Sequence, residues 1–236
     1  MIRLLPLLLA AALAGGCGEV AGQGGTATVW VTRDEGAQVL VVSEVPAGLT
    51  AMQALDRVAD VETRYGGRFV EAIDGLEGSL SSRRDWFYFV NGYEADRSAS
   101  EYTLRDGDVE WWDYRSWAKR QRAPVVVGAF PEPFLHGYGG VRRPALVVYT
   151  RAEDAAPAGK LARVLGGQAR RMRGGSPDLP ENVNVLWLGT GGREAFSATF
   201  VAGSAAGDPV VFLLQGGARA LAADPGRFRY RYEVGR

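Results

Sequence analysis

The sequence predicts an α+β protein of two small domains, and three observations support this class. Much of the 236-residue chain consists of short stretches in which apolar and polar residues alternate, the pattern of half-buried strands. Turn signals, of which Asn91-Gly92 is the strongest, separate these stretches. Apolar residues recur at helical spacing in only a few segments, the first of them at residues 50–61.

The N-terminal segment predicts export. Arg3 precedes an apolar run at residues 4–13, which is too short to span a membrane and fits the core of a signal peptide. Small residues and then the only cysteine, Cys17, follow, as in a bacterial lipoprotein signal. We therefore expect a signal peptide at residues 1–16, lipidation of Cys17 and a flexible tether at residues 17–25. Cleavage after Ala14, which would release a secreted soluble protein, is the alternative.

The first domain is expected at residues 26–117. Alternating stretches at residues 26–32 and 39–45 predict a strand pair, and Thr50 is a candidate N-cap for the helix that follows. Three further strands are predicted, around residues 69–73, at 86–90 and at 109–114. Two strands, one helix and three strands are typical of a β-grasp domain (ubiquitin-like, soluble-ligand-binding), with the helix on one face of the sheet.

Four motifs in this domain carry a resemblance to a known family. They are Gly-Arg-Phe-Val at residues 67–70, Ile-Asp-Gly-Leu at 73–76, Trp-Phe-Tyr-Phe-Val-Asn-Gly at 86–92 and Tyr-Thr-Leu-Arg-Asp-Gly-Asp at 102–108. In this order and spacing, residues 39–117 resemble the transcobalamin-C-terminal-like family, a β-grasp module of unknown function in bacteria. The resemblance implies a domain that binds a soluble ligand without catalysis, with corrinoids as one ligand class. The vitamin carriers clamp cobalamin with an additional helical barrel, for which this chain has no helical repeats.

A basic linker is expected at residues 118–123 and a second domain, an α/β unit with a mixed sheet, at 124–236. Strand patterns occur at residues 125–130, 144–150, 183–188, 210–214 and 228–234, and helical spacing occurs at residues 157–165 and around Leu221. Residues 196–201 fit either a strand or a helix. Residues 131–140 and 174–182 are expected to be loops.

Composition excludes several function classes. The chain has 27 basic and 27 acidic side chains, so it lacks the net charge that attracts nucleic acid. One cysteine forms no internal disulfide, and one histidine excludes sites that need two. No Gly-x-Ser-x-Gly motif is present. Glycines at residues 189–192 and 216–217 follow buried strands, as phosphate-binding loops do, but complete no known motif and are predicted to be turns. We expect no catalytic residues, no metal site and no required cofactor.

Aromatic side chains form the candidate ligand site. Strand alternation places Trp86 and Tyr88 on one face and Phe87 and Phe89 on the other, so both faces are aromatic. These rings either stack on a flat ligand or a partner, or pack within the protein. Turn residues at the strand ends are the other candidates. The full set is Trp86, Tyr88, Asn91, Tyr93, Trp111, Trp112, Tyr114 and His136.

His136 lies between Phe134 and Tyr138, in the Pro/Gly-rich loop expected at residues 131–140 of the second domain. Its imidazole is a candidate ligand for the cobalt of a corrinoid, and ordinary packing among aromatic neighbours is the alternative.

These observations predict a non-catalytic, exported lipoprotein that binds a small soluble ligand, cobalamin being the candidate, for an uptake system. Its expected partners are this ligand, an envelope transporter or other envelope protein, and the membrane through the lipid anchor alone. The alternative function is a cell-envelope protein-interaction module that uses an exposed aromatic patch.

Overall fold

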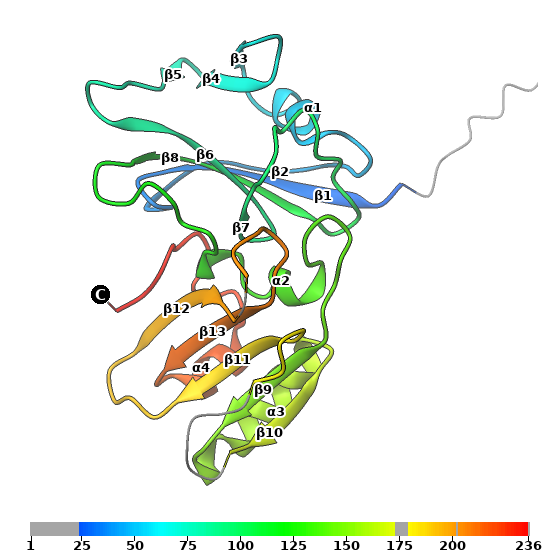
Figure 1. Ribbon diagram of the computed structural model, residues 1–236, viewed down its shortest axis with the longest axis vertical. Helices are drawn as coiled ribbons and strands as arrows, with labels where there is room; N and C mark the ends of the chain where they lie inside the picture. Colours follow the sequence, from blue (N-terminus) through cyan, green and yellow to red (C-terminus); the bar gives the residue numbers. More distant parts are fainter. Residues whose placement is uncertain (1–23, 173–178, 202, 236) are drawn as a thin grey trace, which may run out of the picture.

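The computed structural model describes residues 24–172, 179–201 and 203–235, which form three sheets and a few short helices (Figure 1). The predicted signal peptide, Cys17 and most of the predicted tether lie outside the described residues. The α+β class is confirmed, because sheets dominate and helices are short and interspersed. No helix among the described residues has the length and apolar character needed to cross a membrane.

The first five-stranded sheet has the order β2-β1-β8-β6-β7. Its first and last strands in the sequence, β1 and β8, are parallel neighbours at its centre, whereas the other pairs are antiparallel. The strands are β1 (Thr26–Arg33), β2 (Gln38–Pro46), β6 (Arg84–Val90), β7 (Tyr93–Glu94) and β8 (Val109–Ser116).

A second layer covers one face of this sheet (Figure 1). It contains the helix α1 (Ala51–Asp56) and a three-stranded sheet of β3 (Val61–Arg64), β4 (Phe69–Ile73) and β5 (Leu76–Glu77). Thr50 is the N-cap predicted from the sequence, and it forms a reciprocal capping box with Gln53. The predicted extension of this helix to Val61 is wrong, because Val61 pairs with Ile73 and begins β3.

The second five-stranded sheet has the order β10-β9-β11-β13-β12. Four of its strands are parallel, and β12 runs antiparallel at one edge, so the predicted mixed pairing is confirmed. The strands are β9 (Ala145–Tyr149), β10 (Gln168–Arg171), β11 (Asn184–Gly189), β12 (Ala195–Phe200) and β13 (Val210–Gln215). The helices of this half are η1 (Val127–Ala129), α2 (Glu132–Leu135), η2 (Ala152–Asp154), α3 (Ala155–Val164) and α4 (Ala218–Ala223).

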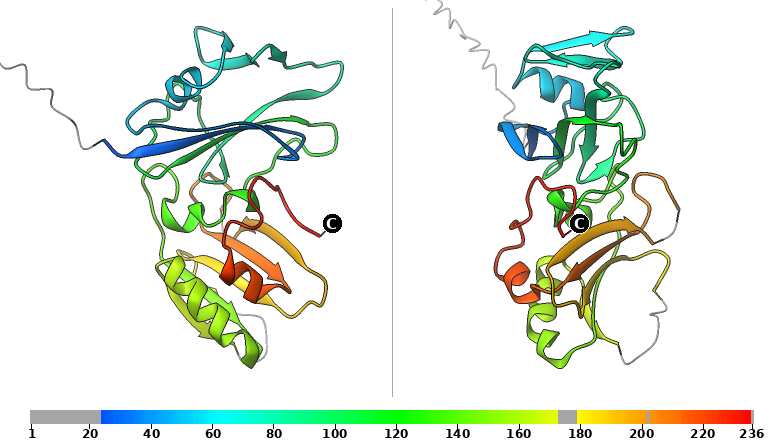
Figure 2. Two further views of the ribbon diagram at one scale, coloured as in Figure 1. Left: turned by 180° about the vertical axis from the view of Figure 1, so that it is seen from behind. Right: turned by 90° about the vertical axis from the view of Figure 1, so that its left-hand side faces the viewer.

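Two predicted strands of this half are wrong. Residues 125–130 contain the short helix η1, and residues 228–234 form turns with one isolated bridge. The two segments bind each other instead, because Val127 N–H donates to the Tyr232 carbonyl and Tyr230 N–H donates to the Gly128 carbonyl. Figure 2 shows that the C-terminal segment runs between the two five-stranded sheets, and its Tyr230 and Tyr232 pack in the cluster that contains Trp111.

Apolar packing is continuous across the molecule. The largest buried cluster includes Val29 of the first sheet, Phe134 of α2 and Phe212 of the second sheet. A smaller cluster covers the opposite face of the first sheet, where Trp111 packs with Tyr232. The domain boundary at residues 118–123 stays a prediction.

Candidate functional site

An aromatic-lined hollow lies between the first five-stranded sheet and the layer of α1 and β4, and we call it the aromatic pocket. Its volume is about 190 Å³. β6 and β8 supply rings, α1 and β4 supply apolar side chains, and the loop after β7 closes one side. The lining residues are Met52, Arg68, Phe69, Val70, Trp86, Tyr88, Arg97, Ser98, Ala99 and Trp112.

Cross-strand register brings the rings of this pocket together. β6 and β8 pair so that Tyr88 lies opposite Trp112 and Trp86 lies opposite Tyr114. Residues opposite each other point to the same face of a sheet. The rings of Tyr88 and Trp112 stack with centroids 4.8 Å apart and planes 17° apart. Those of Trp86 and Tyr114 are 5.3 Å apart and tilted by 54°. A flat group that enters the pocket meets aromatic faces.

Polar groups lie behind the rings. The Trp112 indole Nε1 donates a hydrogen bond of 2.5 Å to Oε1 of Glu110, which is completely buried. Glu110 Oε2 and the Tyr88 hydroxyl are buried and lack a hydrogen-bond partner among the described residues. Burial raises the pKa of Glu110 well above its usual value, although the Trp112 hydrogen bond opposes this shift. Burial also raises the pKa of Tyr88. Burial therefore favours the neutral form of both groups.

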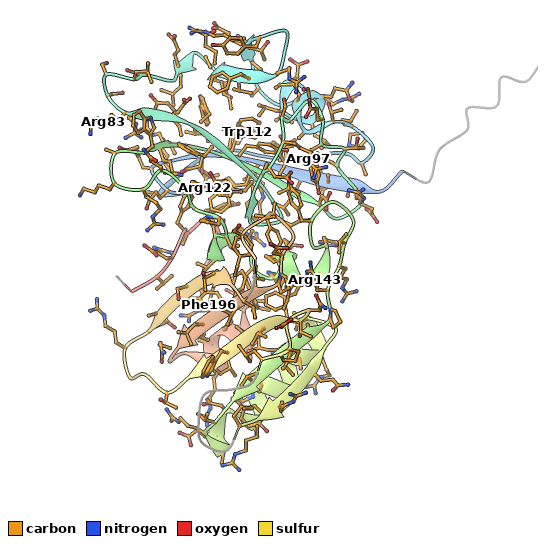
Figure 3. The ribbon with its side chains drawn as sticks, viewed as in Figure 1. Arg83, Arg97, Trp112, Arg122, Arg143 and Phe196 are labelled. Carbon is orange, nitrogen blue, oxygen red and sulfur yellow. The ribbon has the colours of Figure 1, made fainter. Side chains whose placement is uncertain are left out.

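Two arginines stand at the rim of the pocket. Arg68 lines it beside β4, and Arg97 lines it from the loop after β7. Arg97 Nε donates to Asp96 Oδ1 at 2.7 Å, and its guanidinium carbon lies 5.7 Å from the ring centroid of Tyr138. Figure 3 shows Arg97 and Trp112 in the part of the molecule above the second sheet. Both guanidinium groups are already ion-paired, Arg68 with Glu101 and Arg97 with Asp96, so the rim carries little net charge.

The structure separates the predicted site residues into groups. Trp86, Tyr88 and Trp112 line the aromatic pocket, and Tyr114 lies next to Trp86. All of the predicted tryptophans are largely buried, so they form no exposed patch. The predicted alternative of packing within the chain accounts for most of these rings.

Trp111 and Tyr93 lie away from the pocket. Trp111 points to the opposite face of the sheet, where its ring makes edge contacts with Trp30 and Tyr232 at 5.9 and 5.5 Å. Tyr93 is buried with its ring centroid 5.8 Å from that of Tyr138. Burial raises the pKa of Tyr93 to about 12. Both rings pack inside the protein.

Asn91 organises a turn in this structure. Its Nδ2 donates to Asp108 Oδ1 at 2.7 Å and to the Gly137 carbonyl at 2.9 Å. Its Oδ1 accepts from the Val109 N–H at 2.7 Å. Asn91 is fully buried, so these three bonds satisfy a polar side chain that has no contact with solvent.

His136 packs against a turn of the first half of the chain. Its Nδ1 is 2.6 Å from Glu132 Oε2, and a Cβ at Gly107 would lie 2.2 Å from its Nε2. Burial raises the pKa of Glu132, and the hydrogen bond to His136 opposes the shift. Among the described residues, no three His, Cys, Asp or Glu side chains gather where they could hold a metal ion.

Sequence reasoning missed seven of the ten residues that line the pocket, and it missed Glu110, which lies beneath Trp112 and does not line it. Met52 and Phe69 come from α1 and β4, whose packing on the sheet fixes them there. Arg97 comes from a loop that carries no motif. The position of Glu110 could have been predicted from the sequence, because a residue that alternates with Trp112 and Tyr114 along a strand lies on the same face as they do.

Comparison of the sequence with known proteins gives one domain match. Residues 48–116 match the family described as Domain of unknown function (DUF4430). The match covers α1 to β8, including every element that lines the aromatic pocket. No curated protein matches the chain significantly.

Two solved structures show local likeness to the chain. A protein of Ruminococcus gnavus, for which metal binding has been suggested, matches 39% of this chain and 97% of its own, with 21% identity and a TM-score of 0.32. Haptocorrin in complex with Cbi matches 39% of this chain with 17% identity and a TM-score of 0.31. The match spans 26% of the haptocorrin chain.

Proposed function

We propose that this protein binds a small soluble ligand in the aromatic pocket and catalyses no reaction. The observation that carries the proposal is the stacked pair of Tyr88 and Trp112 at the base of an open hollow. Stacked rings that border a cavity offer apolar faces to a flat ligand.

The strand order of the first sheet supports a β-grasp domain. A central parallel pair of the first and last strands, flanked by an N-terminal hairpin and crossed by one helix, suits the fold that the sequence motifs imply. The family resemblance names corrinoids as one ligand class for such a domain. Cobalamin is therefore the ligand to test first.

The size of the pocket limits how a corrinoid would bind. A hollow of about 190 Å³ is smaller than the usual small-molecule site of roughly 300–1,000 Å³. Only an edge or a side group of the macrocycle fits inside it. A second surface, from a transporter or another envelope protein, would cover the remainder for uptake.

Titration calorimetry of the full chain with cobalamin and cobinamide tests the ligand. Saturable heat that Ala99→Leu abolishes is expected, because Ala99 is buried and lines the pocket, so a larger side chain fills it. Ala169→Leu is the matched control, since Ala169 is exposed on β10 and distant in the sequence. If neither cobalamin nor cobinamide gives saturable heat, this ligand class is excluded.

The proposal includes export and a lipid anchor. The lipoprotein-like sequence around Cys17 supports this part. Mass spectrometry of the mature protein should find a diacylated N-terminal cysteine, and Cys17→Ser should shift the protein to the soluble fraction. A mature chain that begins at Gly15 would show the alternative, secretion without an anchor.

A second candidate function is an envelope protein-interaction module. Two exposed rings favour it, because Tyr65 is 78% and Phe69 is 44% exposed, with centroids 6.4 Å apart. These rings, and not the buried tryptophans, would form the interface. A partner that co-purifies with the full chain should be lost from Tyr65→Ser, and its retention there would count against this function.

A further inference from the structure

The second sheet has the topology that creates a crevice at one edge. The chain leaves β9 through α3 toward β10 on one side, whereas it leaves the adjacent strand β11 toward β12 and β13 on the other side. Connections from two adjacent parallel strands therefore diverge at their carboxyl ends. In open α/β sheets, small molecules bind at such points.

A hollow of about 480 Å³ lies at these strand ends. Its lining includes Arg151, just after β9, Gly189, the last residue of β11, and Gly216, Gly217 and Arg219, which follow β13. The volume is within the usual range for a small-molecule site. Figure 1 shows that β9, β11 and β13 run side by side, so their ends meet at one edge.

Backbone conformation favours glycine at one side of this hollow. Gly216 and Gly217 both have positive φ, of 67° and 66°. A side chain at either position would be strained, and a Cβ at Gly217 would lie 2.2 Å from Glu194 Oε1. Glycine at these positions lets the main chain itself border the hollow.

Two arginines, Arg151 and Arg219, and two carboxylates, Glu153 and Asp154, line the hollow, so its formal charges balance. Arg151 pairs with Glu153 and lies 4.0 Å from Asp154, so the positive charge at this side is offset. Arg219 is exposed at the opposite side and has no ion-pair partner among the described residues. Next to Arg151, the Thr150 hydroxyl is buried and lacks a hydrogen-bond partner within the described part of the chain.

We propose that this crevice binds a small molecule through an oxyanion group, carboxylate or phosphate, which pairs with Arg219 beside the glycine backbone. An unpaired guanidinium next to main chain without side chains suits a compact anion. The site shares no residue with the aromatic pocket, so its failure would leave the proposed ligand function of that pocket unaffected.

Amide NMR of the full chain, titrated with inorganic phosphate and separately with citrate at constant ionic strength, tests the site. Saturable shifts are expected at residues 150–154, 189–192 and 216–220. The anion that binds with the higher affinity shows whether the site prefers phosphate or carboxylate. Arg219→Gln should weaken the binding at least tenfold, and Arg219→Lys should retain part of it. Arg163→Gln is the control, because Arg163 is exposed on α3 and does not line the hollow.

Two results would overturn the proposal. One is the absence of saturable shifts at these residues with either probe. The other is equal binding in Arg219→Gln and wild type, which would mean an adventitious ion only. Because Arg219 is exposed, its substitution should leave the thermal unfolding transition unchanged, so lost binding would not reflect lost folding.

Discussion

The indole Nε1 of Trp112 donates a 2.5 Å hydrogen bond to the buried carboxyl group of Glu110, two residues earlier on the same face of β8. This contact links the aromatic pocket to an acid inside the protein. The indole uses its only donor on this bond, so Trp112 offers a ligand its ring face alone.

The first prediction concerns Glu110→Gln. Burial raises the pKa of Glu110 in the folded protein. As pH rises above the ordinary glutamate pKa of about 4.3, the unfolded chain loses this proton while the folded chain keeps it. The free energy of unfolding should therefore fall with pH, by up to about 1.4 kcal/mol per pH unit from this group. Urea unfolding between pH 5 and 8 should show a smaller fall in Glu110→Gln.

Glu62→Gln is the control for this experiment, because Glu62 is exposed on β3. Its pH dependence should equal that of the wild type. If Glu110→Gln also retains the wild-type pH dependence, Glu110 does not stay protonated in the folded protein.

A second prediction is that one face of the first sheet contributes to stability alone, whereas the other face binds the ligand. Trp111 is completely buried and packs against Trp30, Phe89 and Tyr232. Trp111→Ala should cost about 3–5 kcal/mol of unfolding free energy because it leaves a large cavity. Ligand affinity in the folded fraction should not change, because Trp111 lies opposite the aromatic pocket. Calorimetry below the unfolding temperature would measure this, and a lost affinity would assign Trp111 to the site.

A third prediction tests the contact between His136 and the turn at Gly107. Gly107 has a φ of 80°, and a Cβ there would lie 2.2 Å from His136 Nε2. Gly107→Ala should destabilise the protein through both backbone strain, about 1–2 kcal/mol, and this clash. In the His136→Ala background only the strain should remain. Equal costs in the two backgrounds of a double-mutant cycle would show that the ring is not packed there.

The capping box of α1 gives a fourth prediction. Thr50→Ala should lower the unfolding free energy by about 1 kcal/mol, because the Gln53 N–H loses its acceptor. Thr50→Ser retains the hydroxyl and should restore most of the loss in chemical denaturation. Equal stability of the alanine and serine variants would mean that the box contributes nothing.

Much of the first sheet could be predicted from the sequence because apolar and aromatic residues recur along its strands. β1, β6 and β8 follow such stretches, although β1 and β8 are largely buried on both faces, and Asn91-Gly92 marks a real turn. β10 could not be predicted, since all four of its residues are exposed at the edge of the sheet and no apolar alternation remains.

The candidate site was only partly predictable. Trp86, Tyr88 and Trp112 could be grouped because strand alternation decides the face on which they lie. Alternation does not say what covers that face. The partners from α1, β4 and the loop of Arg97 depend on tertiary packing between segments distant in the sequence. The same limit applies to Tyr232, which covers Trp111 from the far end of the chain.

The central claim is that a ligand stacks on Trp112 in the aromatic pocket, and one comparison tests it most directly. Cobalamin is titrated by calorimetry into the wild type, Trp112→Ala and Trp187→Ala, the last being a tryptophan on the second sheet. The account predicts saturable binding to the wild type, retained affinity in Trp187→Ala and at least tenfold weaker binding in Trp112→Ala. Equal affinity in all three proteins would contradict it.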